Sequence, residues 1–309
     1  MNHPVSRLLT AALASTLAGA LLASAAPAAF AQTAPVAAAP APEPARPIRA
    51  SKIILIGDST TQSNSGWGGR FCSDHVVSFV ACLNLARGGR STSNYRAEGS
   101  WDIALAEMST SAYVETYVLI QFGHNDQPGK PGRSTDLATE FPQNLRRYVA
   151  ETRAKGAIPV LVTPLTRRQF VDGKLDNDLE PWAAAIRGVA AETNTPLLDL
   201  NADSAAAVQA MGPSLAAGFA QSPPSPVVAA ALLTGTTVPA NTGAPVSAAP
   251  AAGAAPAPAQ NNAAVEPMGD AKLSFDYTHL GPVGASFFST MVTRELAIAV
   301  PALRRNLIN

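Results

Sequence analysis

The chain has 309 residues, of which 47% are hydrophobic, so it is long enough to bury the core of one or two domains. Its 22 basic and 22 acidic residues give a formal net charge of zero, which offers no electrostatic argument for nucleic acid or an anionic membrane as the main partner. Alanine- and proline-rich stretches inflate the hydrophobic content, and we therefore expect one compact domain.

The first residues have the pattern of a signal peptide. Arg7 precedes an alanine- and leucine-rich run at residues 8–26, and a small-x-small sequence, A-F-A, ends at Ala31. We therefore expect residues 1–31 to be removed on export to a periplasm or to the outside of the cell. A membrane anchor is the alternative, but the small residues favour cleavage. No later segment is long and apolar enough to span a bilayer.

An alanine- and proline-rich stretch at residues 32–50 is typical of an extended linker, and we expect the folded domain to span residues 51–309. The run of apolar residues 53–56 predicts a short strand buried on both faces. Gly57 ends this strand, and Asp58, Ser59 and Thr60 are of the types that cap helix N-termini. Ser59 is therefore expected where a strand stops and a helix could begin, and open α/β sheets bind ligands at such strand ends.

The next segment carries an aromatic side chain and the only two cysteines. Trp67 lies among glycines close to the first strand end, and it is a candidate either for core packing or for a substrate platform. An oxidising compartment would allow Cys72 and Cys82 to form a disulfide, and two buried free thiols are the alternative. The apolar run at residues 76–85 predicts a second strand that ends at Asn84, followed by a glycine-rich loop at residues 86–93.

Strands and helices alternate along the rest of the first 200 residues. Apolar runs predict strands, helical spacing predicts helices, and the alternation indicates a parallel sheet covered on both faces. The expected elements are a strand at 117–122, a helix at 137–155, a strand at 158–163, a helix at 179–192 and a strand at 196–200.

The composition changes after Asn201. A weak helix is expected at residues 202–211, but no charged residue occurs between Asp203 and Glu266. Because Ala, Pro, Ser, Thr and Gly dominate this segment, we expect residues 221–266 to form a low-complexity insertion, either disordered or a loop, and not a second domain. Order is expected to return at Lys272, with a closing helix over residues 283–300.

The histidines narrow the search for a general base. Downstream of the predicted signal peptide the chain has only His75, His124 and His279. Asp276 lies three residues before His279, and on one turn this spacing lets the carboxylate hold one ring nitrogen while the other accepts a proton from Ser59. An Asp-x-x-His pair is weak evidence alone, but a strand-end serine supplies the missing nucleophile.

Acyl transfer also requires donors for a developing oxyanion. Three strand ends offer them: the backbone N–H of Ser59, a backbone N–H in the Gly88-Gly89 loop, and the side-chain amide of Asn125. Taken singly, the glycine pair is equally well a tight turn and Asn125 a strand cap.

The order of four motifs resembles the SGNH, or GDSL-like, hydrolases, and most of all their rhamnogalacturonan acetylesterase branch. These motifs are G-D-S-T at 57–60, G-G-R-S at 88–91, G-H-N-D at 123–126 and D-Y-T-H-L at 276–280, and V-T-P-L-T-R-R at 162–168 is also similar to that branch. The resemblance covers residues 52–200 and 272 onwards.

The resemblance implies a three-layer, flavodoxin-like α/β fold with a sheet of about five parallel strands and no metal or organic cofactor. It implies Ser59 as nucleophile, His279 as base and Asp276 as the partner of that base. Gly89 and Asn125 would join the Ser59 amide in the oxyanion hole. The implied substrate is an acetylated pectic polysaccharide, cleaved through an acyl-enzyme, and a monomer is expected.

Candidate substrate contacts near the site are Asp58, Trp67 and His124. Three other functions compete with the pectic acetylesterase. An esterase for another carbohydrate or small acyl ester, such as acetylxylan, shares its chemistry. A metal-dependent hydrolase would use Asp58, His124, Asp126, Asp276 and His279, although no H-E-x-x-H or cysteine-pair spacing supports it. A carbohydrate-binding protein without catalysis would leave the polar strand ends unexplained.

Overall fold

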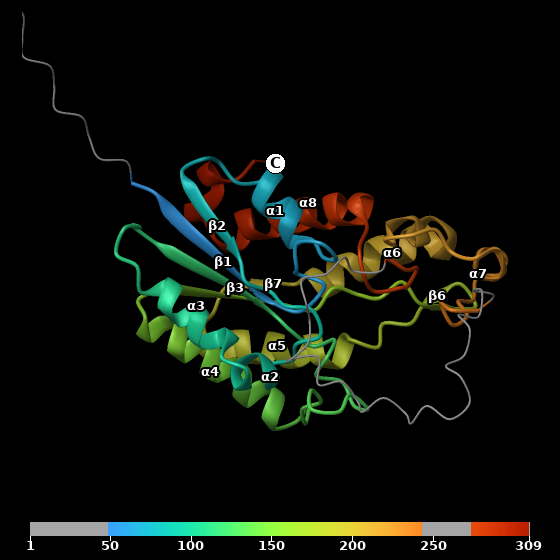
Figure 1. Cartoon of the computed structure of the whole chain (residues 1–309), viewed down its shortest axis with the longest axis horizontal. Helices are drawn as coiled ribbons and strands as arrows, with labels where there is room; N and C mark the ends of the chain where they lie inside the picture. The colour runs from blue at the N-terminus through green and yellow to red at the C-terminus, as the bar shows by residue number, and fades with distance from the viewer. Residues whose placement is uncertain (1–48, 243–272, 309) are drawn as a thin grey trace, which may run out of the picture. The chain divides into compact units, whose positions relative to one another are not determined.

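The computed structural model describes residues 49–242 and 273–308. The predicted signal peptide, most of the predicted linker and residues 243–266 of the predicted insertion lie outside these ranges. Five parallel strands form the main sheet: β1 (Ser51–Gly57), β2 (Val80–Asn84), β3 (Thr116–Gln121), β4 (Ile158–Val162) and β7 (Leu197–Leu198). Their order is β2-β1-β3-β4-β7 (Figure 1). This is the flavodoxin-like order, and it confirms the predicted fold class.

Strand β1 lies inside the sheet and is covered on both faces. Residues 53–56 have no exposed surface. Because side chains alternate along a strand, Ile53 and Leu55 pack into one core cluster while Ile54 and Ile56 pack into the other. A continuous apolar run is therefore what this position requires.

One face of the sheet is covered by α1 (Gly68–Asp74), α6 (Leu200–Ala216) and α8 (Pro282–Ala299) (Figure 1). Two short 3-10 helices, η1 (Ala217–Phe219) and η2 (Pro301–Asn306), complete this layer. A disulfide between Cys72 and Cys82 joins α1 to β2, which decides between the two alternatives left open for the cysteines.

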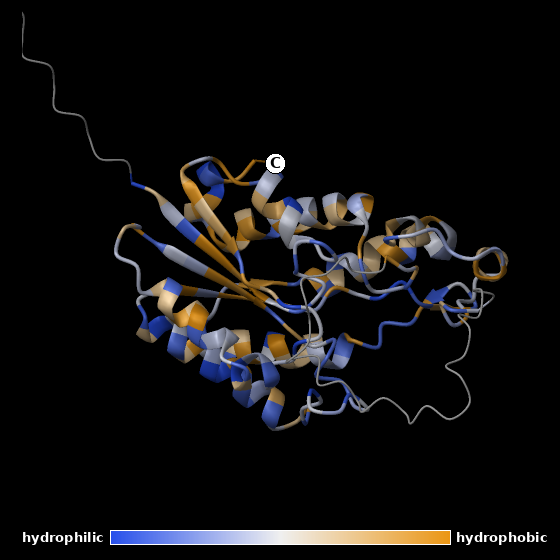
Figure 2. Cartoon of the chain, in the orientation of Figure 1, coloured by the Kyte–Doolittle hydropathy of each residue, from blue (hydrophilic) through white to orange (hydrophobic). Residues whose placement is uncertain are grey.

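The other face is covered by α2 (Asn94–Ala97), α3 (Ser100–Met108), α4 (Glu140–Ala154) and α5 (Glu180–Thr193). Figure 2 shows apolar residues in the strands and on the sheet-facing sides of these helices, with polar residues on their outer sides. The sheet thus separates two cores, as expected for three layers. Within the described ranges, no helix combines the length and the apolar character needed to cross a membrane.

The second strand is shorter than the apolar run at residues 76–85 predicts, because it begins only at Val80. The residues before it pair with the C-terminal segment. Val76 forms an isolated bridge with Leu307, and the Val77 N–H donates to the Asn306 carbonyl. The predicted strand was too long because its first residues pack against the other end of the chain.

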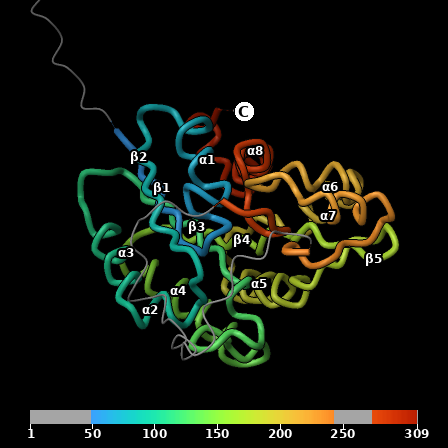
Figure 3. Tube along the Cα trace, turned by 45° about the vertical axis from the view of Figure 1, so that its right-hand side comes forward, coloured from blue at the N-terminus to red at the C-terminus, as the bar shows by residue number. Residues whose placement is uncertain are grey.

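The prediction of a disordered insertion is wrong for residues 221–242, which are folded and contain α7 (Pro226–Leu232). Val228 and Leu232 are buried against Tyr277, and the Tyr277 hydroxyl donates to the Val238 carbonyl at 2.7 Å. The segment also lies beside a hairpin of β5 (Phe170–Val171) and β6 (Lys174–Leu175), and Figure 3 shows α6, α7 and β5 gathered on one side of the molecule.

Candidate active site

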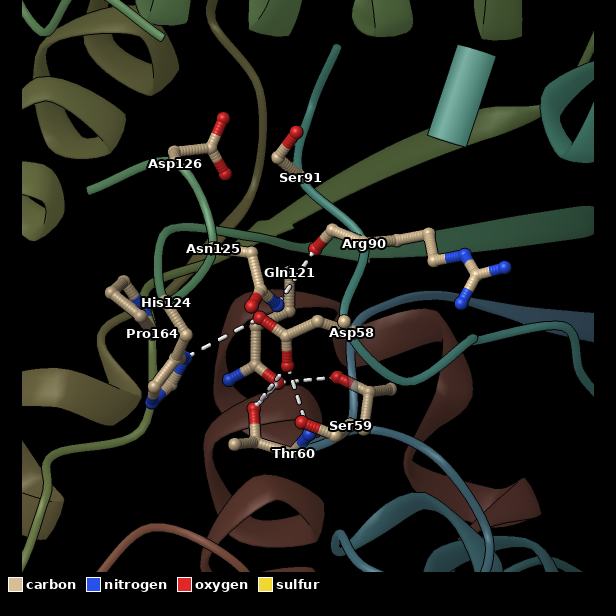
Figure 4. Close-up of polar contacts among 12 residues, drawn as sticks. Asp58, Ser59, Thr60, Arg90, Ser91, Gln121, His124, Asn125, Asp126 and Pro164 are labelled. Carbon is tan, nitrogen blue, oxygen red and sulfur yellow. Dashed lines mark hydrogen bonds and ion pairs between the residues drawn. The ribbon is translucent and has the colours of Figure 1, made fainter. Parts of the chain in front are cut away.

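Ser59 directly follows β1, at the carboxyl end of the sheet. The chain passes from β1 to β2 on one side and returns to β3 on the other, so this end of β1 is the switch point at which such sheets bind ligands. No helix begins here, contrary to the prediction, since α1 starts at Gly68. Instead, the Asp58 carboxylate accepts hydrogen bonds of 2.8 Å from the Thr60 N–H and hydroxyl and closes a tight turn (Figure 4).

Two glycines allow the close approach of the loops around this turn. A Cβ on Gly57 would lie 2.7 Å from the Gln121 carbonyl oxygen on β3, which is too close for any side chain. Gly89 has a φ of +74°, in the left-handed region that favours glycine. Gly57 therefore allows β1 and β3 to approach closely at their carboxyl ends, and Gly89 allows the loop after β2 to turn there.

Ser59, His279 and Asp276 form one continuous hydrogen-bonded line. His279 Nε2 lies 2.9 Å from Ser59 Oγ, and His279 Nδ1 lies 2.7 Å from Asp276 Oδ2. The other Asp276 oxygen accepts from the backbone N–H groups of Thr278 and His279, at 2.7 and 2.6 Å. These two bonds fold residues 276–279 into the single turn that the Asp-x-x-His spacing predicts, and 220 residues of chain separate the serine from the histidine.

The surroundings of Asp276 favour its charged form. Burial raises the pKa of this carboxyl, but the hydrogen bond and charge of His279 and the backbone donors outweigh burial and lower the pKa to about 2. Asp276 is therefore ionised at neutral pH. An ionised carboxylate on Nδ1 keeps the other ring nitrogen free to accept a proton from the serine.

The two further candidate oxyanion donors lie on neighbouring loops. Gly89 follows β2 and Asn125 follows β3, and both loops face the Ser59 turn (Figure 4). One Nδ2 hydrogen of Asn125 donates to the Arg90 carbonyl at 3.0 Å, which fixes the amide in place. Because an amide carries two donor hydrogens, the second remains for another acceptor.

The three candidate substrate contacts are buried, and their assignment needs correction. Trp67 has no exposed surface, and its Nε1 donates to the Gln121 side chain at 3.0 Å. Asp58 is fully buried and lies 3.4 Å from Nδ1 of His124, which is only 3% exposed. Burial lowers the pKa of His124, more than the neighbouring Asp58 carboxylate raises it. These side chains support the nucleophile turn from inside and do not face the substrate.

The residues considered for a metal site are engaged in separate interactions. Asp126 accepts hydrogen bonds from Thr92 and Thr135, and burial raises its pKa to about 7. Asp276 holds His279, and Asp58 holds the serine turn. Within the part of the chain that the structure describes, no group of three or more His, Cys, Asp or Glu side chains has metal-binding geometry.

Two residues that sequence reasoning did not single out connect the parts of the site. Arg168 is 1% exposed, and its guanidinium donates to the backbone carbonyls of Asp276 and His279, each at 2.9 Å. Ser65 donates to the Ser59 carbonyl at 2.7 Å, and its own carbonyl accepts from the Leu280 N–H at 2.8 Å. Arg168 could have been found from the sequence, because it is the last residue of the V-T-P-L-T-R-R motif. No local pattern marks Ser65.

Residues 55–222, which include Ser59, Gly89 and Asn125, match the model of the GDSL-like Lipase/Acylhydrolase family. The chain belongs to this family. It is a carboxylic ester hydrolase, and the serine, histidine and aspartate described above are the groups that such chemistry needs.

Two curated relatives of this GDSL-like hydrolase come from Bacillus subtilis. The chain is 36% identical over 157 residues to the probable rhamnogalacturonan acetylesterase YesY, an alignment that covers 49% of this chain and 70% of the relative. It is 36% identical over 173 residues to the rhamnogalacturonan acetylesterase RhgT, with 52% and 70% covered.

Among solved structures, the fold is similar to that of the YxiM protein of Bacillus subtilis. The TM-score is 0.55 at 22% identity, over 82% of this chain and 58% of the other. The chain thus spans somewhat more than half the length of that protein. At this identity the likeness shows the shared fold, which agrees with the strand order.

Proposed function

We propose that this hydrolase is an exported serine esterase that removes acetyl groups from pectic polysaccharide through an acetyl-enzyme. The observation that carries the proposal is the unbroken line from Ser59 Oγ through His279 to Asp276. The identity of 36% to two rhamnogalacturonan acetylesterases supports the choice of ester and of polymer.

In the proposed reaction, His279 Nε2 takes the proton of Ser59 Oγ as that oxygen attacks the acetyl carbonyl carbon. The carbonyl oxygen becomes an oxyanion, for which the Ser59 and Gly89 N–H groups and the free Asn125 Nδ2 hydrogen are the candidate donors. His279 then gives its proton to the departing sugar oxygen, and the acetyl group stays on Ser59. Water, activated by the same histidine, releases acetate and restores the serine.

Export is supported by two independent features. The residues before Gln32 have the composition of a signal peptide, and the Cys72–Cys82 disulfide is a bond that persists in oxidising compartments. Sequencing the N-terminus of the protein recovered from periplasmic and culture fractions would test this part. A start near Gln32 is expected, and a protein that retains residues 1–31 would contradict it.

The substrate is tested by acetate release from three esters assayed side by side: acetylated rhamnogalacturonan, acetylated xylan and a simple aryl acetate. We expect the highest kcat/KM on rhamnogalacturonan. A preference for xylan would overturn the pectic assignment and leave the esterase assignment intact. Turnover of none of the three would contradict acetylesterase activity itself.

A further inference from the structure

Three basic side chains gather beside the candidate oxyanion donors. Lys130 Nζ donates to the His124 carbonyl at 2.6 Å, and Arg133 Nη1 donates to the Gly89 carbonyl at 3.4 Å. Arg167 forms an ion pair with Asp178 nearby. The first two contacts lie on the loops that carry Gly89 and Asn125, so these charges are fixed next to the position of the ester.

The loop that carries Lys130 and Arg133 is held at both ends. The N–H groups of Arg133 and Ser134 donate to the Lys130 carbonyl at 3.0 and 2.9 Å and close a turn. Where the loop ends, the Thr135 N–H and hydroxyl donate to the Asp126 carbonyl and carboxylate, at 2.9 and 3.0 Å. The two basic side chains therefore start from an ordered backbone, which lowers the entropy cost of binding an anion.

The cluster of Lys130, Arg133 and Arg167 has more positive than negative charge. Among residues 49–242 and 273–308, no carboxylate lies within salt-bridge distance of Lys130 or Arg133, and Asp178 is the acidic partner of Arg167. Burial, followed by the charges of Arg167 and Arg133, lowers the pKa of Lys130, and these effects outweigh the Asp58 and Asp178 carboxylates, which raise it. Partly buried cations that repel one another leave a position where an anion would relieve the repulsion.

We propose that Lys130 and Arg133 form a subsite for the carboxylate of a uronic acid residue, next to the sugar whose ester Ser59 attacks. A guanidinium and an ammonium are the side chains that bind carboxylates by charge-assisted hydrogen bonds. This inference rests on the proposed function, since the carboxylate belongs to the same polymer as the ester. It adds a source of preference for charged pectic chains over neutral xylan.

The test compares one polymer in two charge states. Acetylated rhamnogalacturonan is assayed as isolated and after its galacturonate carboxyls have been reduced to primary alcohols, with the acetyl content of the two samples matched. For the wild type we expect kcat/KM to be about tenfold higher on the charged polymer, mainly through KM, and to lose this advantage in high salt.

The variants are Lys130→Gln and Arg133→Gln, alone and combined, with Arg133→Lys as the variant that keeps the charge. Lys155→Gln and Arg305→Gln are the matched controls, because both side chains are exposed and Lys155 lies before β4, at the amino ends of the strands and away from the site. We expect the ratio of kcat/KM between charged and reduced polymer to fall about tenfold in the double variant and to stay close to the wild-type ratio in Arg133→Lys. The controls keep the wild-type ratio.

A second measurement separates this inference from the choice of substrate. Deacetylated rhamnogalacturonan oligosaccharides are added as inhibitors of aryl acetate hydrolysis, beside neutral xylo-oligosaccharides. Stronger inhibition by the charged oligosaccharide, lost in the double variant, supports the subsite even if xylan is the better substrate. An unchanged charged-to-reduced ratio in the double variant, or equal inhibition by both oligosaccharides, would overturn the subsite while acetate release from pectin still stood.

Discussion

The Arg168 guanidinium lies beneath the turn that carries Asp276 and donates to its backbone carbonyl at 2.9 Å. A second bond of the same length reaches the His279 carbonyl, so one side chain holds both ends of the turn. Because Arg168 is 1% exposed and does not touch Ser59 Oγ or the ester position, it acts by positioning the histidine.

Replacement of this arginine by lysine keeps the charge. The lysine ammonium lacks the planar guanidinium fork, so it cannot donate to both carbonyls in the same way. We expect Arg168→Lys to lower kcat about tenfold or more, with little change in KM, because the base is misplaced while the substrate surface is intact. Steady-state kinetics on an aryl acetate measure this split. A variant that loses stability but keeps the wild-type kcat would show that Arg168 serves folding alone.

Removal of the Asn125 amide tests the third oxyanion donor. Asn125→Ala is expected to lower kcat by about 10²-fold, the usual loss for one such donor, because the interaction strengthens only in the transition state. Asn64→Ala is the matched control, since that amide is exposed on the segment after Ser59. Equal kcat values in the two variants would remove Asn125 from the oxyanion hole.

The disulfide between Cys72 and Cys82 joins α1 to β2 across a sequence separation of 10. Its loss in Cys72→Ser/Cys82→Ser is expected to lower the free energy of unfolding by about 2–3 kcal/mol, because the unfolded chain gains freedom. Urea denaturation measures this difference, and a reducing agent should shift the wild-type midpoint toward that of the variant. Identical midpoints in both proteins would count against a stabilising bond.

Glu295 on α8 has two buried carboxylate oxygens with no well-formed hydrogen bond among the described residues. Burial, together with the charges of Asp203 and Asp199, outweighs the backbone N–H of Asp199 and raises the pKa of Glu295 from 4.5 to about 8. Below pH 4.5 the carboxyl is protonated in the folded and unfolded states. Between pH 4.5 and 8 only the unfolded state loses the proton, so the stability of the wild type falls as the pH rises.

Glu295→Gln removes this dependence. We expect it to raise the free energy of unfolding at pH 8 by an amount on the order of 2 kcal/mol and to have little effect at pH 4.5. Chemical denaturation of both proteins across this pH range measures the difference. Asp102→Asn, at an exposed carboxylate on α3, controls for the general loss of a negative charge. A gain that does not depend on pH would contradict the account.

Local sequence predicted those segments of the fold in which every residue is buried. The run at residues 53–56 is apolar because β1 is buried on both faces, and that is visible in four residues. The burial of Trp67 could not be predicted locally, since its partners in the core and the acceptor of its Nε1 hydrogen, Gln121, lie far along the chain. Likewise, α7 is ordered by apolar contact with Tyr277, although its own composition suggested disorder.

The reacting residues of the candidate site were predicted better than the residues that hold them in place. Ser59, Asp276 and His279 have residue types and spacings that acyl-transfer chemistry requires, and the structure brings them into hydrogen-bond contact. Asp58 was expected near the substrate but is buried, because a carboxylate that closes the turn must face the backbone donors. Acyl transfer restricts the residue types of the reacting groups, so a sequence reveals them. Many different arrangements of neighbouring side chains can hold these groups in place, so a sequence does not reveal those.

The most direct measurement of the central claim is acetate release from acetylated rhamnogalacturonan by the wild type and by Ser59→Ala, with both proteins shown to be equally folded. If Ser59 is the nucleophile, the variant loses at least about 10³-fold in kcat, since no acetyl-enzyme forms. His279→Ala should fall to a comparable level, because the two residues act as one unit. Turnover by Ser59→Ala close to that of the wild type would contradict the serine mechanism.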